Sequence, residues 1–233
     1  MDLREIRSRF VDYYGGRGFQ LLPRAPMLHP SIPMSFVMSA GLVQVETSLA
    51  QAQNRRGNKF VLVQDCFRHF DLKAVGTDEV HLSLFEMPGA FIFGTDEREN
   101  FIGAVWKFVT TDLSLDAERI WVSYFGGDEL ANQRLAADEQ TYRTWRDIGV
   151  PQNRIVGLGK THNYWIQGGG LQNQESILRK CGPHTELFYD RDPRRKCSAH
   201  CQPGCRCGRF VEFSNTLFIS HEFDPQNNRL YPK

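Results

Sequence analysis

The chain has 233 residues, of which 41% are hydrophobic, 12% aromatic and 24% charged, a composition typical of a globular domain with a packed core. Lys and Arg number 28 and Asp and Glu number 27, which argues against nucleic-acid binding driven by a basic excess of the whole chain. No segment approaches the roughly 20 apolar residues of a membrane span. Residues 1–10 also lack the apolar core of a signal peptide, so we expect a cytoplasmic location and no membrane partner.

Apolar periodicity and turn residues predict the elements of the first half of the chain. Leu3, Ile6 and Phe10 recur at helical spacing and predict a helix over 2–14. Four prolines between residues 21 and 34 predict an irregular, extended segment. The other predicted segments are a short strand or turn at 36–45, a solvated helix end and loop at 48–58, hairpin arms at 59–67 and 81–93, and a helix over 101–113.

The second half of the chain is predicted to be rich in strands. Its segments are a strand at 119–125, a polar helix at 129–147, strands at 162–167, 185–190 and 209–222, and turns at 168–170 and 224–228. Strands outnumber helices and several adjoin through hairpins, which favours an α+β fold, an antiparallel β-sheet flanked by helices. We expect one domain over residues 1–233, with a Cys-rich insert at 181–208.

The predicted hairpin from Cys66 to Gly94 groups three side chains that suit a nucleotide. Arg68 opens its polar loop, Asp71 follows, and Phe85 lies on the return arm. A guanidinium binds phosphate oxygens in a fixed geometry, and an aromatic ring can stack on a base. A loop arginine can equally be a solvated surface residue, and the aromatic and Met side chains of the return arm can belong to the core.

Short motifs along the chain resemble, in order, those of the catalytic domain of alanyl-tRNA synthetases. They are IRSRFVDYY, SAGLVQ, DCFR, FDLKAVG, HLSLFEMPGAFIFG, NYW, CGPHTELFYD and RFVEFSNTLF. The resemblance runs from residue 4 to about residue 232, and the shared order of the motifs makes it specific. It implies a class II synthetase fold and the attack of an amino-acid carboxylate on the α-phosphate of ATP. The products would be an aminoacyl-adenylate and pyrophosphate, and tRNA would be the acceptor.

The same resemblance implies roles for residues of the hairpin. Arg68 matches the arginine of the family's second motif, which clamps the α-phosphate and the substrate carboxylate and is the implied catalytic group. Asp71 matches the acid of the N-D-L-x-x-V-G segment, and Phe85 matches the ring that stacks on adenine. Here the loop after the arginine is about four residues shorter and lacks the family's lysine, for which His69 could substitute.

Residues of the second half match the amino-acid pocket of the family. Trp165 matches the tryptophan of the N-F-W segment, a wall of the pocket. Glu212 and Asn215 match the E-I-W-N segment near ATP, magnesium and the amino acid. The resemblance implies alanine or another small amino acid as the substrate. Ser214 replaces the tryptophan of the E-I-W-N segment, which is expected to enlarge or repolarise the pocket and so argues against strict specificity for alanine. Mg²⁺ is implied as a bridge between phosphate oxygens, and no general base is needed because the attacking carboxylate is already ionised.

Two further departures from the family leave alternatives open. An extra segment at about 169–180 interrupts the family's G-P-C-G-P-C turn, and the third motif, D-x-G-x-G-L-E-R, is expected just beyond Lys233. We therefore expect an N-terminal piece, or a paralogue completed by a partner, that is a poor catalyst alone. The alternatives are an enzyme that loads an amino acid onto a carrier protein or small molecule, and an inactive nucleotide-binding regulator. A homodimer is a further candidate assembly.

Five of the six cysteines fall between residues 181 and 207, which favours a metal over disulfides. Cys197, Cys201, Cys205 and Cys207 follow a C-x3-C-x3-C-x-C pattern on a Gly- and Pro-containing loop. Four thiolates can surround a structural, tetrahedral Zn²⁺. Free thiols and disulfides are the alternatives, and the further candidate ligands are Cys181, His184 and His200. The loop is also basic, which suits either a solvated turn or a contact with RNA or a carrier protein.

Overall fold

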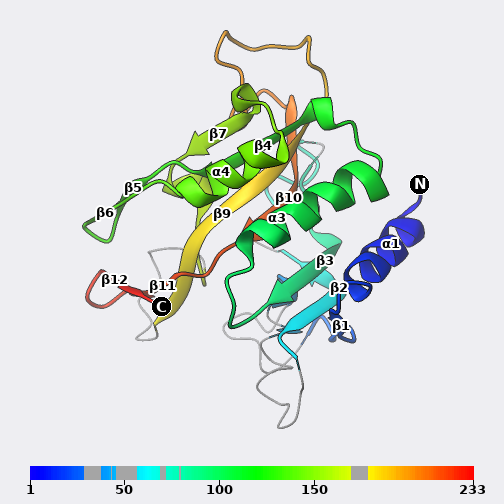
Figure 1. Cartoon of the computed structure of the whole chain (residues 1–233), viewed down its shortest axis with the longest axis horizontal. Helices are drawn as coiled ribbons and strands as arrows, with labels where there is room; N and C mark the ends of the chain where they lie inside the picture. The colour runs from blue at the N-terminus through cyan, green and yellow to red at the C-terminus, as the bar shows by residue number, and fades with distance from the viewer. Residues whose placement is uncertain (29–37, 43, 46–56, 69–71, 79, 169–177) are drawn as a thin grey trace. The chain divides into compact units, whose positions relative to one another are not determined.

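The computed structural model describes residues 1–28, 38–42, 44–45, 57–68, 72–78, 80–168 and 178–233 (Figure 1). These residues form two compact units, Met1–Glu97 (unit 1) and Arg98–Lys233 (unit 2). No helix among them is long and apolar enough to cross a membrane. The expectation that the whole chain forms one domain with an insert at 181–208 stays a prediction.

Unit 1 packs one helix against a small sheet. Its elements are α1 (Leu3–Gly15), β1 (Gln20–Leu21), β2 (Lys59–Phe67) and β3 (Leu84–Ile92). Asp2 caps α1, because its side chain accepts a hydrogen bond from the backbone N–H of Glu5 at 2.9 Å. The strands lie in the order β1-β2-β3, with β1 parallel and β3 antiparallel to β2.

The hairpin predicted around residues 59–93 is confirmed. β2 and β3 pair without a register shift from Lys59 opposite Ile92 to Phe67 opposite Leu84. The centre of β2 is buried because apolar side chains on both of its faces pack into the core. The core clusters of this unit are Leu22, Val45, Phe60 and Leu62, and Ala25, Met38 and Cys66.

The prediction of a strand or turn at 36–45 is wrong in its described part. The backbone is helical at 41–42 and 44–45, and this turn places Val45, which is fully buried, in the core cluster with Phe60. A helical turn buries this side chain more effectively than an exposed loop, so tertiary packing overrides the Ser-Ala-Gly turn signal. Most of the loop predicted at 48–58 lies outside the described residues.

Unit 2 is built around the long strand β9, which lies near the middle of Figure 1. One edge of β9 pairs with β4 and β8, and the other edge pairs with β10 and β11. All of these pairs are antiparallel, and only β7 joins β4 in parallel. The strands are β4 (Ile120–Phe125), β5 (Asp128–Leu130), β6 (Gln133–Leu135), β7 (Ile155–Leu158), β8 (Tyr164–Ile166), β9 (Arg179–Asp190), β10 (Phe210–Leu217), β11 (His221–Asp224) and β12 (Arg229–Pro232).

Helices flank this sheet, so the predicted α+β architecture is confirmed. They are α3 (Arg98–Lys107), which continues as a π-helical turn (Phe108–Asp112), α4 (Glu139–Ile148) and α5 (Lys160–Asn163). Trp106 of α3 meets Trp145 of α4 with ring centroids 5.9 Å apart. The Nε1 atom of Trp145 donates to Thr185 of β9 at 2.8 Å, which fixes α4 against one face of the sheet.

Two element predictions in unit 2 are wrong in their boundaries. The helix predicted at 129–147 begins only at Glu139, because Ala131 and Asn132 adopt positive φ values of 50° and 58° and form the turn of a β5–β6 hairpin. Asp138 then caps α4. The strand predicted at 209–222 breaks after Leu217 and resumes as β11. β7 was not predicted, since four residues give too little periodicity.

The remaining strand predictions hold in part. The strand predicted at 162–167 is shorter, because α5 occupies residues up to Asn163 before β8 begins. The strand predicted at 185–190 is the second half of the longer β9. The strand predicted at 119–125 is β4, and the turn predicted at 224–228 joins β11 to β12.

Candidate functional site

Arg68 and Phe85 lie together at the loop end of the β2–β3 hairpin. The backbone N–H of Arg68 donates to Ser83 at 2.8 Å, which extends the strand pairing by one residue. The guanidinium carbon lies 5.2 Å from the centroid of the Phe85 ring, within range of a cation–π contact. The Nε atom of Arg68 lies 3.4 Å from the carbonyl oxygen of Ser39. The predicted cation and aromatic face are therefore adjacent.

The Phe85 ring is half-buried on its strand rather than solvated. It packs against the cluster formed by Ala25, Met38 and Cys66, and burial raises the pKa of the Cys66 thiol to about 11. This thiol is therefore protonated and behaves as a small apolar group. Packing against this cluster holds the Phe85 ring in one orientation. A ring that is already fixed in place loses less entropy when a base stacks on it.

A charged network holds the strand that carries Phe85. Glu86 accepts hydrogen bonds from Arg7 at 2.8 Å and from Arg24 at 2.8 Å, and Arg24 also donates to Asp65 at 2.9 Å. Burial alone would raise the pKa of Glu86, but the hydrogen bonds from the two arginines outweigh it and hold this pKa below its ordinary value. Glu86 is thus a structural anion beside the site.

The hairpin loop is organised by Asp78. Its carboxylate accepts hydrogen bonds from the backbone N–H groups of Val80 and His81 at 3.0 and 2.9 Å, and it lies 2.6 Å from the His81 ring. The backbone bond from Val80 is the largest cause that lowers the pKa of Asp78. The predicted ATP contact Asp71, together with His69, lies outside the described residues.

A β-bulge brings Glu212 and Asn215 to one face of the sheet. Residues three apart on a regular strand point to opposite faces. Here the register shifts between Glu212 and Ser214, so Glu212 pairs with Phe188 and Asn215 pairs with Glu186. Paired residues point to the same face, so both side chains lie on the face of β9 that carries Gly182, His184 and Glu186, which we call the Glu186 face. Both are exposed.

Trp165 reaches the Glu186 face from the opposite edge of β9. It pairs with Gly182 on β8 and is half-buried. A Cβ atom at Gly182 would lie 1.9 Å from the carbonyl oxygen of Phe218, so the close approach of the chain after β10 requires glycine there. Three of the predicted site residues therefore share one face of unit 2.

Ser214 does not join them, because its pairing with Leu187 directs it to the other face. That face is covered by α4, whose Trp145 bonds Thr185. The part predicted for Ser214 in the amino-acid pocket stays a prediction.

A buried polar network supports the Glu186 face. His184 and Glu186 are each 8% exposed, and His184 Nε2 lies 3.3 Å from Glu186 Oε1. Ser123 of β4 lies 3.4 Å from Glu186 and accepts from Asn163 at 2.9 Å. The Nδ1 atom of His184 and the Oδ1 atom of Asn163 make no hydrogen bond among the described residues. Sequence reasoning missed this network, although the polar TE pair inside the apolar strand of TELFYD was a signal.

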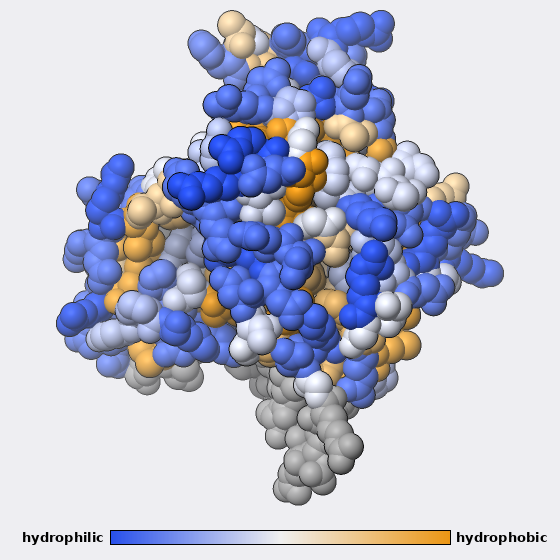
Figure 2. Space-filling model, in the orientation of Figure 1, coloured by the Kyte–Doolittle hydropathy of each residue, from blue (hydrophilic) through white to orange (hydrophobic). Residues whose placement is uncertain are grey.

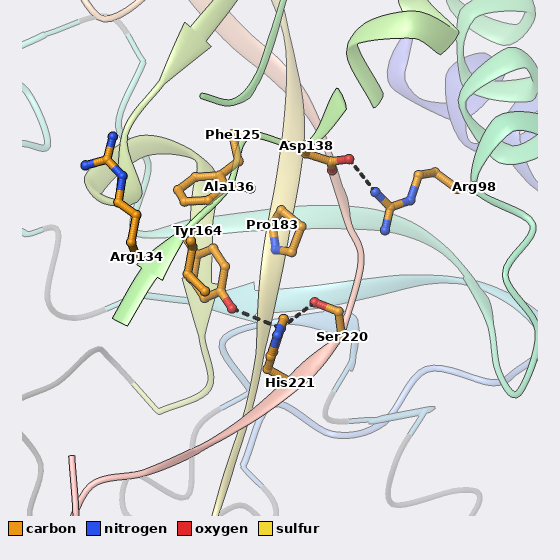
Figure 3. Close-up of a pocket in the computed structure, with 10 residues that line it drawn as sticks. Arg98, Phe125, Arg134, Ala136, Asp138, Tyr164, Pro183, Ser220 and His221 are labelled. Carbon is orange, nitrogen blue, oxygen red and sulfur yellow. Dashed lines mark hydrogen bonds and ion pairs between the residues drawn. The ribbon is translucent and has the colours of Figure 1, made fainter. Parts of the chain in front are cut away.

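A separate pocket of about 320 Å³ opens on the other face (Figure 3). Tyr164, Pro183 and His221 line it, and the Arg98–Asp138 ion pair, at 2.6 Å, contributes to its wall. His221 Nδ1 lies 2.8 Å from Ser220 Oγ and 3.3 Å from Tyr164 Oη. Burial lowers the pKa of His221, so this ring is neutral at pH 7. The pocket contains none of the residues that the sequence predicted for the site.

The cysteine cluster lies in the loop between β9 and β10. The Sγ atoms of Cys197, Cys201 and Cys205 all lie within 4.8 Å of one another, and Cys207 Sγ is 3.8 Å from Cys201 Sγ. All six cysteines of the chain are free thiols. A hydrogen bond from the backbone of Cys197 and another from Arg209 lower the pKa of Cys201 to about 7.

The other candidate ligands stand apart from this cluster. Cys181 of β9 belongs to the apolar cluster with Tyr164, and His184 contacts the carbonyl oxygen of His162. The loop itself is hydrophilic: it forms the top of the view in Figure 1, and Figure 2 colours most of that surface blue. Its exposed basic residues are Arg191, Arg194, Arg195, Lys196 and Arg206.

The antiparallel-rich sheet of unit 2, flanked by helices, is consistent with the class II synthetase fold. The hairpin of unit 1 carries an arginine beside an aromatic ring. The family model described as tRNA synthetases class II (A) matches residues 5–231, and the chain belongs to this family. The resemblance noted in the motifs is therefore confirmed.

Curated relatives narrow the comparison within the family. The alanine–tRNA ligase of Desulforudis audaxviator is 35% identical over 222 residues, which are 95% of this chain and 23% of the relative. The alanine–tRNA ligase of Desulforamulus reducens is 31% identical over 227 residues, or 97% of this chain and 24% of the relative. That of Alkaliphilus oremlandii is 29% identical over 230 residues, or 98% and 24%. The chain thus spans about a quarter of the length of these relatives.

Proposed function

We propose that the chain activates a small amino acid, alanine in the first instance, with ATP and passes it to tRNA. The position of Arg68, held at the end of a strand pair beside the fixed ring of Phe85, carries this proposal. The names of the relatives, all alanine–tRNA ligases, support the substrate and the acceptor.

In the proposed reaction a carboxylate oxygen of the amino acid attacks the α-phosphorus of ATP. The bond from that phosphorus to the oxygen bridging the α- and β-phosphates breaks, and pyrophosphate leaves with its electron pair. Arg68 neutralises the charge that develops on the α-phosphate oxygens, and Phe85 stacks on adenine. Positioning and electrostatics supply the catalysis, because no proton is transferred in this step.

The Glu186 face supplies the amino-acid side of the proposed site. Trp165 forms a wall that suits a small side chain, and the Asn215 amide offers a donor and an acceptor. The exposed carboxylate of Glu212 is an oxygen ligand of the kind that Mg²⁺ takes. Mg²⁺, if held there, would offset the negative charge of the phosphates.

ATP–pyrophosphate exchange, measured on the chain with each of the twenty amino acids, tests activation and specificity. We expect exchange with a small amino acid, and a loss of about 10²–10³-fold for Arg68→Ala because one fixed donor to the developing charge is removed. Arg68→Lys keeps the positive charge but loses the two-point geometry of the guanidinium. Its exchange rate should therefore lie between those of the wild type and Arg68→Ala. Arg4→Ala, an exposed arginine of α1, is the control. Unchanged exchange in Arg68→Ala would refute the role of Arg68, and no exchange with any amino acid would refute activation.

The acceptor is tested separately with labelled amino acid. We expect label on alanine-specific tRNA and none on phosphopantetheinylated carrier protein, since the relatives are named as tRNA ligases. Label on the carrier protein alone would show that the carrier protein, and not tRNA, is the acceptor. A cytoplasmic location and a homodimer belong to the same proposal, and sedimentation of the purified chain tests the second.

A further inference from the structure

We propose that the loop between β9 and β10 is a structural Zn²⁺ site with four thiolate ligands, Cys197, Cys201, Cys205 and Cys207, and that Arg209 positions it. The site is independent of the amino-acid chemistry proposed above. Its role is to fasten the end of β9 to the start of β10.

The spacing of the sulfur atoms fits one tetrahedral ion. With Zn–S bonds of about 2.3 Å, two thiolates of a tetrahedral site lie about 3.8 Å apart. Cys201 and Cys207 are separated by 3.8 Å, and the cluster of Cys197, Cys201 and Cys205 closes to within 4.8 Å. The Cys197 thiol interacts with all three of the others. A disulfide would need about 2.05 Å, so three mutually close free thiols, with a fourth beside Cys201, point to a metal.

The loop has little else to order it. Between residues 191 and 208 only Cys201 and Pro203 are buried, and this segment contains no helix or strand. Gly204 and Gly208 adopt positive φ values of 93° and 73°, which bend the chain on either side of Cys205 and Cys207. Short turns without an apolar core are typical of segments that metal binding stabilises.

Arg209 joins the cluster to both strands. Its side chain is 4% exposed, and it forms a two-point ion pair with Asp190, the last residue of β9, at 2.8 and 2.5 Å. The same side chain contacts the Cys201 thiol. Its buried Nη1 atom makes no hydrogen bond among the described residues, and a metal-bound sulfur would accept from it. Outer-shell donors of this kind fix ligand orientation.

The exposed charges of the loop fit the same assignment. Four thiolates around Zn²⁺ leave a net charge of about −2, while the Arg209–Asp190 pair is neutral. The loop residues Arg194, Arg195, Lys196 and Arg206 supply the compensating positive charge near the surface. The basic character of the loop is therefore explained without an RNA or protein partner.

Elemental analysis of the purified full chain is the first test. We expect about one zinc per chain, with loss of zinc in Cys207→Ser and Cys197→Ser. Cys66→Ala and Cys181→Ala, which remove thiols outside the cluster, should keep it. Replacement by Co²⁺ should give the ligand-field and thiolate charge-transfer bands of a four-sulfur tetrahedral site. These bands are read on wild-type protein, so the test stands even if a Ser variant fails to fold.

Competition with a chromophoric chelator tests Arg209. Arg209→Met should weaken zinc binding by about 10–100-fold, the usual cost of losing an outer-shell partner, and Arg209→Lys should lose less. Removal of zinc should accelerate amide exchange at the start of β10. The proposal is overturned by a zinc-free chain with four titratable thiols, by a disulfide in the cluster, or by full zinc retention in Cys207→Ser. Zinc content should be unchanged in Arg68→Ala, so failure of the synthetase proposal leaves this one intact.

Discussion

Glu86 holds the hairpin of unit 1 in place, although it has no contact with substrate in the proposed reaction. It binds Arg7 of α1 and Arg24, and it neighbours Phe85 on β3. The strand that carries Phe85 is therefore linked by ion pairs to α1 and to the segment after β1.

We predict a pH-dependent loss of stability in Glu86→Gln. The folded pKa of Glu86 is lowered, so its contribution is complete above the ordinary value of about 4.3 and disappears as the pH falls through the lower folded value. At pH 7 the variant should unfold about 1 kcal/mol more easily, the upper range for partly exposed pairs. Urea unfolding followed by circular dichroism measures the difference, which should shrink towards zero below about pH 4. A difference independent of pH would contradict the assignment.

Residue-level predictability differs between the two groups of site residues. Arg68 and Phe85 were predictable because regular pairing of two hairpin arms brings the end of the first arm close to the start of the second, at the loop end. The shared face of Glu212 and Asn215 was not, since it depends on a bulge that no periodicity in RFVEFSNTLF reveals. Ser214 shows the same gap: its motif position suggests the pocket, while the register directs it away.

At the scale of elements, the start of α4 illustrates how a cap overrides composition. Polar residues from 129 onward resemble a solvated helix, but the helix begins only where Asp138 accepts from the backbone N–H of Thr141 at 3.2 Å. The same carboxylate pairs with Arg98, the first residue of α3, at 2.6 Å. One side chain thus starts one helix and binds the beginning of another. A single sequence gives no sign of the second contact.

We predict that Asp138→Ala destabilises unit 2 by about 2–4 kcal/mol, because it removes the cap and leaves the Arg98 charge, 12% exposed, without this partner. Asp138→Asn keeps a capping oxygen and should cost less. All four tryptophans lie in unit 2, so denaturant unfolding followed by tryptophan fluorescence reports on this unit. Equal losses in the two variants would mean that the cap contributes nothing.

At the scale of the whole molecule, the residues to which the family motifs assign roles are divided between the two units. Arg68 and Phe85 belong to unit 1, while Trp165, Glu212 and Asn215 belong to unit 2. The proposed function therefore requires that ATP and the amino acid stabilise each unit.

Hydrogen exchange with ATP and alanine tests that requirement unit by unit. Ligand at 100 times its Kd stabilises the bound state by about 2.7 kcal/mol, or about 100-fold slower exchange for amides that open only when the site opens. We expect protection in β2–β3 and also in β9–β10, with the β5–β6 hairpin unaffected. Arg68→Ala should lose protection in both units, since nucleotide anchors the amino acid. Protection confined to β2–β3 would contradict the roles proposed for Glu212 and Asn215.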